Sequence, residues 1–224
     1  MVFRRDFCRV AAAQRPPLVV LTSDHGEGLL DHGWPIHNRY LYEEEVRIPL
    51  IFRWKQRIPA GLRLAQPAHL VDLLPTLVSL LKLGPSSDAP EDSDGTDLSR
   101  FLSRGGPAEP DPERILWLQR PYYSGAGQKP LRSPELVSEG YGFGLRMGRW
   151  KYMEAPKVGR RELYDLENDG QERSDLASLR EEHGKQLSAH LAEWSRRQLA
   201  SASARAEEAD PEDLQALRAL GYAE

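Results

Sequence analysis

Cysteine is nearly absent from this sequence, because Cys8 is the only one among 224 residues. One cysteine excludes an internal disulfide and a cysteine-based zinc cluster. No apolar run approaches the roughly 18 residues that a membrane span needs. Excess positive charge is absent as well, since the net charge is −4, and this argues against a nucleic-acid partner. The remaining composition, with 40% hydrophobic and 29% charged residues, is that of a globular protein.

The N-terminal sequence lacks the pattern of an export signal. Its first ten residues, MVFRRDFCRV, are basic, but no long apolar stretch follows them. The sequence therefore predicts no signal peptide, and it leaves both the localisation and the oligomeric state open.

Changes in composition divide the chain into five segments. Residues 1–17 are a lead-in that ends in two prolines, which resist regular structure. The pattern of residues 18–84 indicates an α/β core, that of 85–112 a linker, that of 113–200 an antiparallel subdomain, and that of 201–224 a tail helix. The linker is rich in proline, glycine, serine and aspartate, with one docked helical turn expected around Leu98–Leu102.

The segment 18–84 is predicted to hold three short strands and a helix. The run Leu18–Leu21 is fully apolar, which is typical of a strand buried on both faces. Ile48–Phe52 is a second such run, and a third strand is expected near Ala68–Val71. Leucines at helical spacing follow, with Asp72 as the expected N-cap of their helix.

The segment 113–200 is predicted to form a small antiparallel sheet covered by one helix. Short apolar or alternating runs indicate the strands, and Gly148-Arg149 marks a hairpin turn between two of them. The helix carries Leu187, Leu191 and Trp194 on one face. The expected strands are 115–119, 141–147, 150–153 and 162–166, and the expected helix is 181–199.

Candidate chemistry concentrates in the stretch Thr22–His37, TSDHGEGLLDHGWPIH, which holds three of the six histidines. Asp24 and His25 directly follow the first predicted strand, and open α/β sheets bind ligands at the carboxyl ends of their strands. A carboxylate and a neutral imidazole suit a hard or borderline divalent cation, and Gly26 lets the chain turn away. The alternative is that Asp24 caps the next turn and His25 packs against it. Local chemistry alone leaves both interpretations open.

Further motifs follow SDHGE in a fixed order along the chain. Together they resemble the sulfatase family of the alkaline phosphatase superfamily, whose members have a strand running into SD(H/N)GE, a loop with HG, a YEE segment and an R-(V/I)-P-L-I strand. The resemblance runs from residue 18 to the C-terminus. The matching segments are Ser23–Glu27, Asp31–Gly33, Tyr42–Glu44, Arg47–Ile51, Val71–Leu77, Gly144–Tyr152, Glu162–Asp169 and Leu217–Tyr222.

The resemblance implies roles for three residues of this stretch. Asp24 and His25 would be two of four protein ligands to one divalent metal, usually calcium in sulfatases. A basic or imidazole residue shortly before the YEE segment contacts the sulfate group of the substrate. Many members have a lysine where this chain has Asn38. Some branches of the family carry HG at positions 37 and 38 instead, so His37 is the candidate for the sulfate contact.

Other polar residues are expected to be structural. His32 is interpreted as a structural or solvent-facing loop residue, and Tyr42 and Arg47 as residues that orient the loop. The pair Glu43–Glu44 is consistent with a polar segment before a buried strand. Arg149–Lys151 is predicted to belong to a surface hairpin.

The resemblance also implies a catalytic group that this sequence does not contain. Sulfatases use a formylglycine made from the first residue of a C/S-x-P-x-R motif in their N-terminal half, and no such motif occurs here. No residue of this chain is therefore assigned as a nucleophile. The chain is expected to be the C-terminal portion of an alkaline-phosphatase-like α/β fold and to be inactive alone. Three functions stay open: a sulfuric ester hydrolase acting on a sulfate ester, a phosphoester or phosphonate hydrolase of the same superfamily, and a non-enzymatic fragment.

Overall fold

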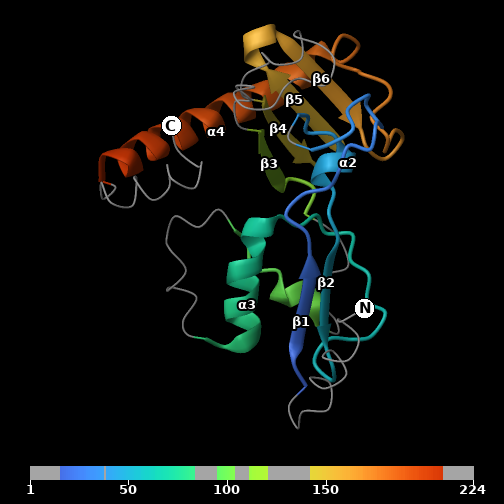
Figure 1. Ribbon diagram of the computed structural model, residues 1–224, viewed down its shortest axis with the longest axis vertical. Coiled ribbons are helices and arrows are strands. Elements are labelled where there is room, and N and C mark those ends of the chain that lie inside the picture. The colour runs from blue at the N-terminus through green and yellow to red at the C-terminus, as the bar shows by residue number, and fades with distance from the viewer. Residues whose placement is uncertain (1–15, 38, 84–94, 104–110, 121–141, 209–224) are drawn as a thin grey trace.

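The computed structural model describes residues 16–37, 39–83, 95–103, 111–120 and 142–208 (Figure 1). Within these residues the chain forms two separate antiparallel sheets and a small number of helices, so the mixed α/β class is confirmed. No helix in the described part is long and apolar enough to cross a membrane. The lead-in up to residue 15, Cys8 included, Asn38, much of the predicted linker and the end of the chain from residue 209 lie outside the described residues.

The first sheet has two strands, β1 (Leu18–Thr22) and β2 (Leu50–Trp54). They pair antiparallel, with Leu21 opposite Ile51. The sequence predicts both strands, but the expected burial on both faces is wrong. Leu21 and Ile51 are 54% and 55% exposed, because nothing in the described residues covers the face that these two partners share.

The predicted third strand, near Ala68–Val71, is a 3-10 turn instead. The turn η1 spans Leu70–Asp72, and the Asp72 carboxylate closes it by accepting the N–H of His69 at 2.6 Å. The same buried carboxylate accepts the N–H of Thr96 at 2.8 Å and lies 2.6 Å from Arg114 Nη2. Asp72 therefore holds three segments together. Although it is the N-cap residue of the next helix, its side chain makes no capping hydrogen bond there.

The predicted leucine-rich helix is present as α3 (Leu73–Leu81). The docked turn in the linker is confirmed as η3 (Ser99–Leu102), which buries Phe101 and Leu102. The N–H of Leu98 donates to the buried hydroxyl of Thr76 at 2.9 Å and so attaches this turn to α3. The N-terminal part of the molecule is thus fixed by buried polar contacts as well as by apolar packing.

The second sheet confirms the predicted antiparallel arrangement. Its strands lie in the order β3 (Ile115–Arg120), β4 (Gly142–Met147), β5 (Trp150–Ala155) and β6 (Arg160–Asp165). The long helix α4 (Glu181–Glu208) extends beyond the predicted end at residue 199 and crosses beside this sheet in Figure 1. Leu187, Leu191 and Trp194 of α4 pack against Leu145, Tyr152 and Leu163 of the strands. Two short elements complete the fold, α2 (Glu43–Val46) and η5 (Pro156–Val158).

Candidate functional site

The candidate site begins where β1 ends. The hydroxyl of Ser23 donates to the carbonyl of His25 at 2.7 Å, and the N–H of His25 donates to Asp24 Oδ1 at 3.0 Å. These short-range bonds make a tight turn that leaves the Asp24 side chain 85% exposed and the His25 side chain 42% exposed. Asp24 Oδ2 and His25 Nε2 lie 3.7 Å apart. Both groups are therefore accessible and adjacent at the carboxyl end of the strand.

Hydrogen bonds to the backbone shift the pKa of both groups. The N–H of His25 donates to the Asp24 carboxylate and holds its pKa below the usual value. The carbonyl of Gly26, 2.7 Å from His25 Nδ1, raises the pKa of His25. This contact favours the tautomer with the proton on Nδ1, which leaves Nε2 as the lone-pair donor toward a ligand.

The structure brings His37 to the same place. The His25 and His37 rings stack with their centroids 4.0 Å apart. His37 Nδ1 lies 3.2 Å from Glu27 Oε2, so this carboxylate orients the ring. The three predicted site residues, Asp24, His25 and His37, therefore lie next to one another at the surface. A loop of the chain separates His37 from the other two in the sequence.

The turn after His25 rests on α2. The N–H of Gly26 donates to the carbonyl of Glu45 at 2.8 Å, and the N–H of Glu27 donates to that of Glu44 at 3.0 Å. A Cβ atom at Gly26 would lie only 2.0 Å from the Glu44 carbonyl oxygen. The glycine of the SDHGE motif is thus required for close backbone contact, in addition to the turn that the sequence predicts.

The donors fit part of a metal shell. Two atoms 3.7 Å apart suit neighbouring ligand positions of one cation that binds at roughly 2.3–2.6 Å. No group of three or more histidine, cysteine, aspartate or glutamate side chains suited to a metal occurs in the described residues. Asp24 and His25 would therefore contribute two ligands to a site that needs others.

Structural contacts surround this surface, as the sequence predicts for His32 and Tyr42. His32 Nδ1 lies 2.6 Å from Glu44 Oε1, and the His32 ring stacks on Tyr42 at 3.7 Å. The Tyr42 hydroxyl donates to both carboxylate oxygens of Glu162, at 3.0 and 3.1 Å. Burial raises the pKa of Tyr42, which stays protonated as a donor.

The prediction for Lys151 is wrong. Its side chain is 0% exposed and lies 3.0 Å from Glu43 Oε1 and 2.8 Å from Glu172 Oε1. Arg149, by contrast, is partly exposed and binds Asp165 near the hairpin turn. Because side chains along a β-strand alternate between its two faces, Lys151 lies on the face opposite to that of Trp150 and Tyr152. On that face it is buried against Glu43 and Glu172. Glu43 is likewise an ion-pair partner rather than part of a plain polar segment.

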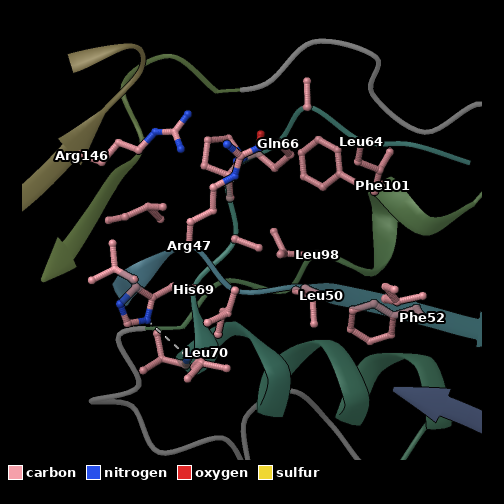
Figure 2. Close-up of a pocket in the computed structure, with 18 of the residues that line it drawn as sticks. Arg47, Leu50, Phe52, Leu64, Gln66, His69, Leu70, Leu98, Phe101 and Arg146 are labelled. Atoms are coloured by element: carbon pink, nitrogen blue, oxygen red, sulfur yellow. Dashed lines mark hydrogen bonds between the residues drawn. The ribbon is translucent and has the colours of Figure 1, made fainter. Parts of the chain in front are cut away.

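A cleft of about 2140 Å³ extends from the Asp24, His25 and His37 surface. Its walls combine apolar side chains with cationic ones contributed by separate parts of the chain. Figure 2 shows Arg47 and Arg146 reaching into the same space, above Leu50 and Phe52 of β2. Sequence spacing could not have found this pair, because Arg47 lies near the first sheet and Arg146 belongs to β4 of the second.

Comparisons with known proteins indicate a likeness to sulfatases. Residues 10–83 match the family model described as Sulfatase. An N-acetylglucosamine-6-O-sulfatase of Bacteroides thetaiotaomicron is 28% identical over 160 residues, which are 71% of this chain and 26% of that protein. The resemblance to the sulfatase family is therefore confirmed.

Solved structures extend this sulfatase likeness to the fold. One, a complex with its substrate D-glucosamine-2-N,6-O-disulfate, has a TM-score of 0.61 and 26% identity, covering 80% of this chain and 34% of that one. A phosphonate monoester hydrolase of Silicibacter pomeroyi has a TM-score of 0.55 and 26% identity, covering 87% and 35%. The chain spans under a third of the length of the curated sulfatases that it matches.

Proposed function

We propose that this chain is part of a metal-dependent sulfatase that hydrolyses a sulfuric ester. The observation that carries the proposal is the grouping of Asp24, His25 and His37 at the carboxyl end of β1, within a sulfatase-like fold. The sulfatase relatives supply the reaction class.

In this proposal each residue of the group has a chemical task. The Asp24 carboxylate and His25 Nε2 would hold a divalent cation, with calcium expected from the family. The cation, when bound, would stabilise negative charge on a sulfate-ester oxygen. With both ring nitrogens protonated, His37 would donate its Nδ1–H to Glu27 and its Nε2–H to a sulfate oxygen.

The proposal assigns no nucleophile to this chain. Ser23 is the hydroxyl nearest to the ligand pair, but it donates to the carbonyl of His25 at 2.7 Å, and the carboxylate beside it, Asp24 at 3.3 Å, is assigned to the metal. We therefore propose that the attacking formylglycine belongs to a part of the enzyme outside this sequence. The isolated chain would then bind ligands weakly and catalyse nothing.

A phosphonate or phosphoester hydrolase is the second candidate. The specific observation in its favour is the phosphonate monoester hydrolase, which matches 87% of this chain. Tetrahedral sulfate and phosphonate groups present similar oxygens to a cation and to an imidazole, so the described residues suit both. The nucleophile, which this chain does not supply, would decide between them.

The test is to supply the missing part and compare substrates. The chain would be produced with its natural upstream sequence and a formylglycine-generating enzyme, and assayed on 4-nitrophenyl sulfate and a phenylphosphonate ester. Calcium-dependent sulfate hydrolysis that falls about 10²-fold or more in Asp24→Ala is expected, because one preorganised electrostatic group is lost. Faster phosphonate hydrolysis would favour the second candidate. No hydrolysis of either ester would favour a non-enzymatic chain.

A further inference from the structure

A buried charge cluster joins the second sheet to the segment before β2. Lys151 of β5 and Glu172, which follows β6, are both fully buried and lie 2.8 Å apart. Lys151 also contacts Glu43, at the first residue of α2, at 3.0 Å. A buried cation between two carboxylates fixes the position of all three groups, because moving any one of them leaves a charge unpaired away from water.

The same cluster holds the backbone around α2. Glu172 Oε2 accepts the N–H of Glu43 at 2.5 Å, which is the first N–H of the helical turn. The carbonyl of Glu172 lies 3.2 Å from His32 Nε2, while the other ring nitrogen of His32 contacts Glu44. Glu172 therefore reaches α2 both directly and through His32.

The backbone of α2 also holds the turn that carries the candidate metal ligands. The carbonyls of Glu44 and Glu45 accept the N–H groups of Gly26 and Glu27, the two residues that follow His25. A continuous series of contacts therefore runs from Lys151, through α2, to the Asp24–His25 turn. A second link, from Arg173 to Asp31, is about half exposed and so is a weak constraint by comparison.

We infer that Lys151 and Glu172 are positioning residues that set the place of the Asp24–His25 turn from the second sheet. They touch neither the ligand pair nor a substrate, and they act through α2. The inference concerns the geometry of the turn and is tested without any metal. Its relevance to catalysis rests on the proposed function.

Amide hydrogen exchange of the whole chain, followed by NMR, tests the inference. In Lys151→Met the amides of Gly26 and Glu27 should exchange at least about 10-fold faster relative to those of β5, because local opening of the turn becomes easier. The ring C–H signals of His25 and His37 should shift as well.

Leu187→Ala is the matched control. Leu187 is fully buried in α4 and contacts the strands of the second sheet, so its truncation destabilises the same part of the molecule without touching α2. It should leave the relative exchange of Gly26 and Glu27 and the two histidine signals unchanged. Equal effects in Lys151→Met and Leu187→Ala would show a merely structural role and overturn the inference.

Lys151→Met could fail to fold, which loss of its near-UV circular dichroism signal would show. Two further variants then test the inference. Glu43→Gln weakens one ion pair of the cluster at nearly constant shape and should accelerate the same amides. Gly26→Ala forces the turn away from the Glu44 carbonyl without changing the charge cluster. It should produce the same shifts of the His25 and His37 signals, while the amides of β5 stay protected from exchange. Unchanged exchange in Glu43→Gln would contradict the role of the cluster.

Calcium titration separates this inference from the proposed function. Asp24→Ala should remove calcium-induced shifts of the His25 signals in the parent chain. Calcium shifts that persist in Asp24→Ala would count against the metal site, while accelerated exchange in Lys151→Met would still support positioning by the cluster. Loss of the calcium shifts in Asp24→Ala together with unchanged exchange in Lys151→Met would support the metal site and exclude the positioning role.

Discussion

At the scale of single residues, exposure separates the two kinds of charge in this molecule. Asp24 and His25 are accessible, and short-range hydrogen bonds and the stacked His37 ring hold them, as suits groups that receive a ligand. Lys151 and Glu172 are fully buried and paired, as groups that maintain a structure should be. The sequence indicates the first pair through the SDHGE motif. The sequence gives no local sign of the Lys151–Glu172 pair, because these residues meet only after β5 and β6 have formed.

Calcium should bind the isolated chain weakly. Asp24 and His25 offer two ligand atoms, and a calcium shell needs about 6–8. We expect a dissociation constant on the order of 10⁻³ M, typical of weak sites, and its loss in Asp24→Ala. Isothermal titration calorimetry measures both. Submicromolar binding that disappears in Asp24→Ala would mean that the chain holds a complete site.

Replacement of Lys151 should be strongly destabilising. Lys151→Met leaves Glu43 and Glu172 without their cation, and breaking a buried ion pair in this way costs about 3–5 kcal/mol. The free energy of unfolding from urea titration is the measurement. The matched change Lys185→Met, at an exposed position of α4, should alter that free energy by less than about 0.5 kcal/mol.

The same variant should acquire a pH dependence of known sign. Burial raises the pKa of the Glu172 carboxyl and Lys151 opposes this, so removing the cation raises that pKa further. A folded-state pKa above the unfolded one gives stability that is present at low pH and lost as the pH rises through the folded value. The destabilisation of Lys151→Met should therefore be larger at about pH 8 than at about pH 5. Adding Glu172→Gln to Lys151→Met should remove much of this difference. If the free energy of unfolding still changed with pH to the same extent, the assignment of the pH dependence to Glu172 would be contradicted.

At the scale of elements, alternation and apolar runs predict strands well, and side-chain hydrogen bonds explain the main error. The strands of the second sheet and the leucine-rich helix lie close to their predicted places, since periodicity reflects which face is buried. The run Ala68–Val71 has strand-like residues, but the Asp72 carboxylate binds the N–H of His69 and turns the backbone. Such local competition is difficult to read from residue types alone.

Asp72 should therefore matter more than an ordinary helix cap. Asp72→Asn keeps the size of the side chain but removes the charge opposite the nearly buried Arg114, and it replaces one acceptor oxygen by a donor. We expect a loss of about 3 kcal/mol or more in the free energy of unfolding, against about 1 kcal/mol for loss of a simple N-cap. Chemical denaturation of Asp72→Asn and of the exposed control Asp97→Asn provides the comparison.

At the scale of the whole molecule, the first sheet is poorly covered. Leu21 and Ile51 of this sheet are more than half exposed although both are large and apolar, and so is Leu74 of α3. Exposed apolar faces and open strand edges of this kind favour association between chains. The motif order predicts the likeness to sulfatases correctly. The cleft walls arise from both sheets and could not be predicted from sequence spacing.

The isolated 224-residue chain should not hydrolyse 4-nitrophenyl sulfate, with or without calcium. A cation and an imidazole stabilise charge that develops when a nucleophile attacks, and they accelerate little when no such group is positioned. Ser23, the nearest hydroxyl, is engaged with the carbonyl of His25. Release of 4-nitrophenol, measured by absorbance, should stay at the rate of buffer alone and be the same for the parent, Asp24→Ala and His37→Ala. Turnover by the parent chain that Asp24→Ala abolishes would show that a nucleophile is present within this sequence.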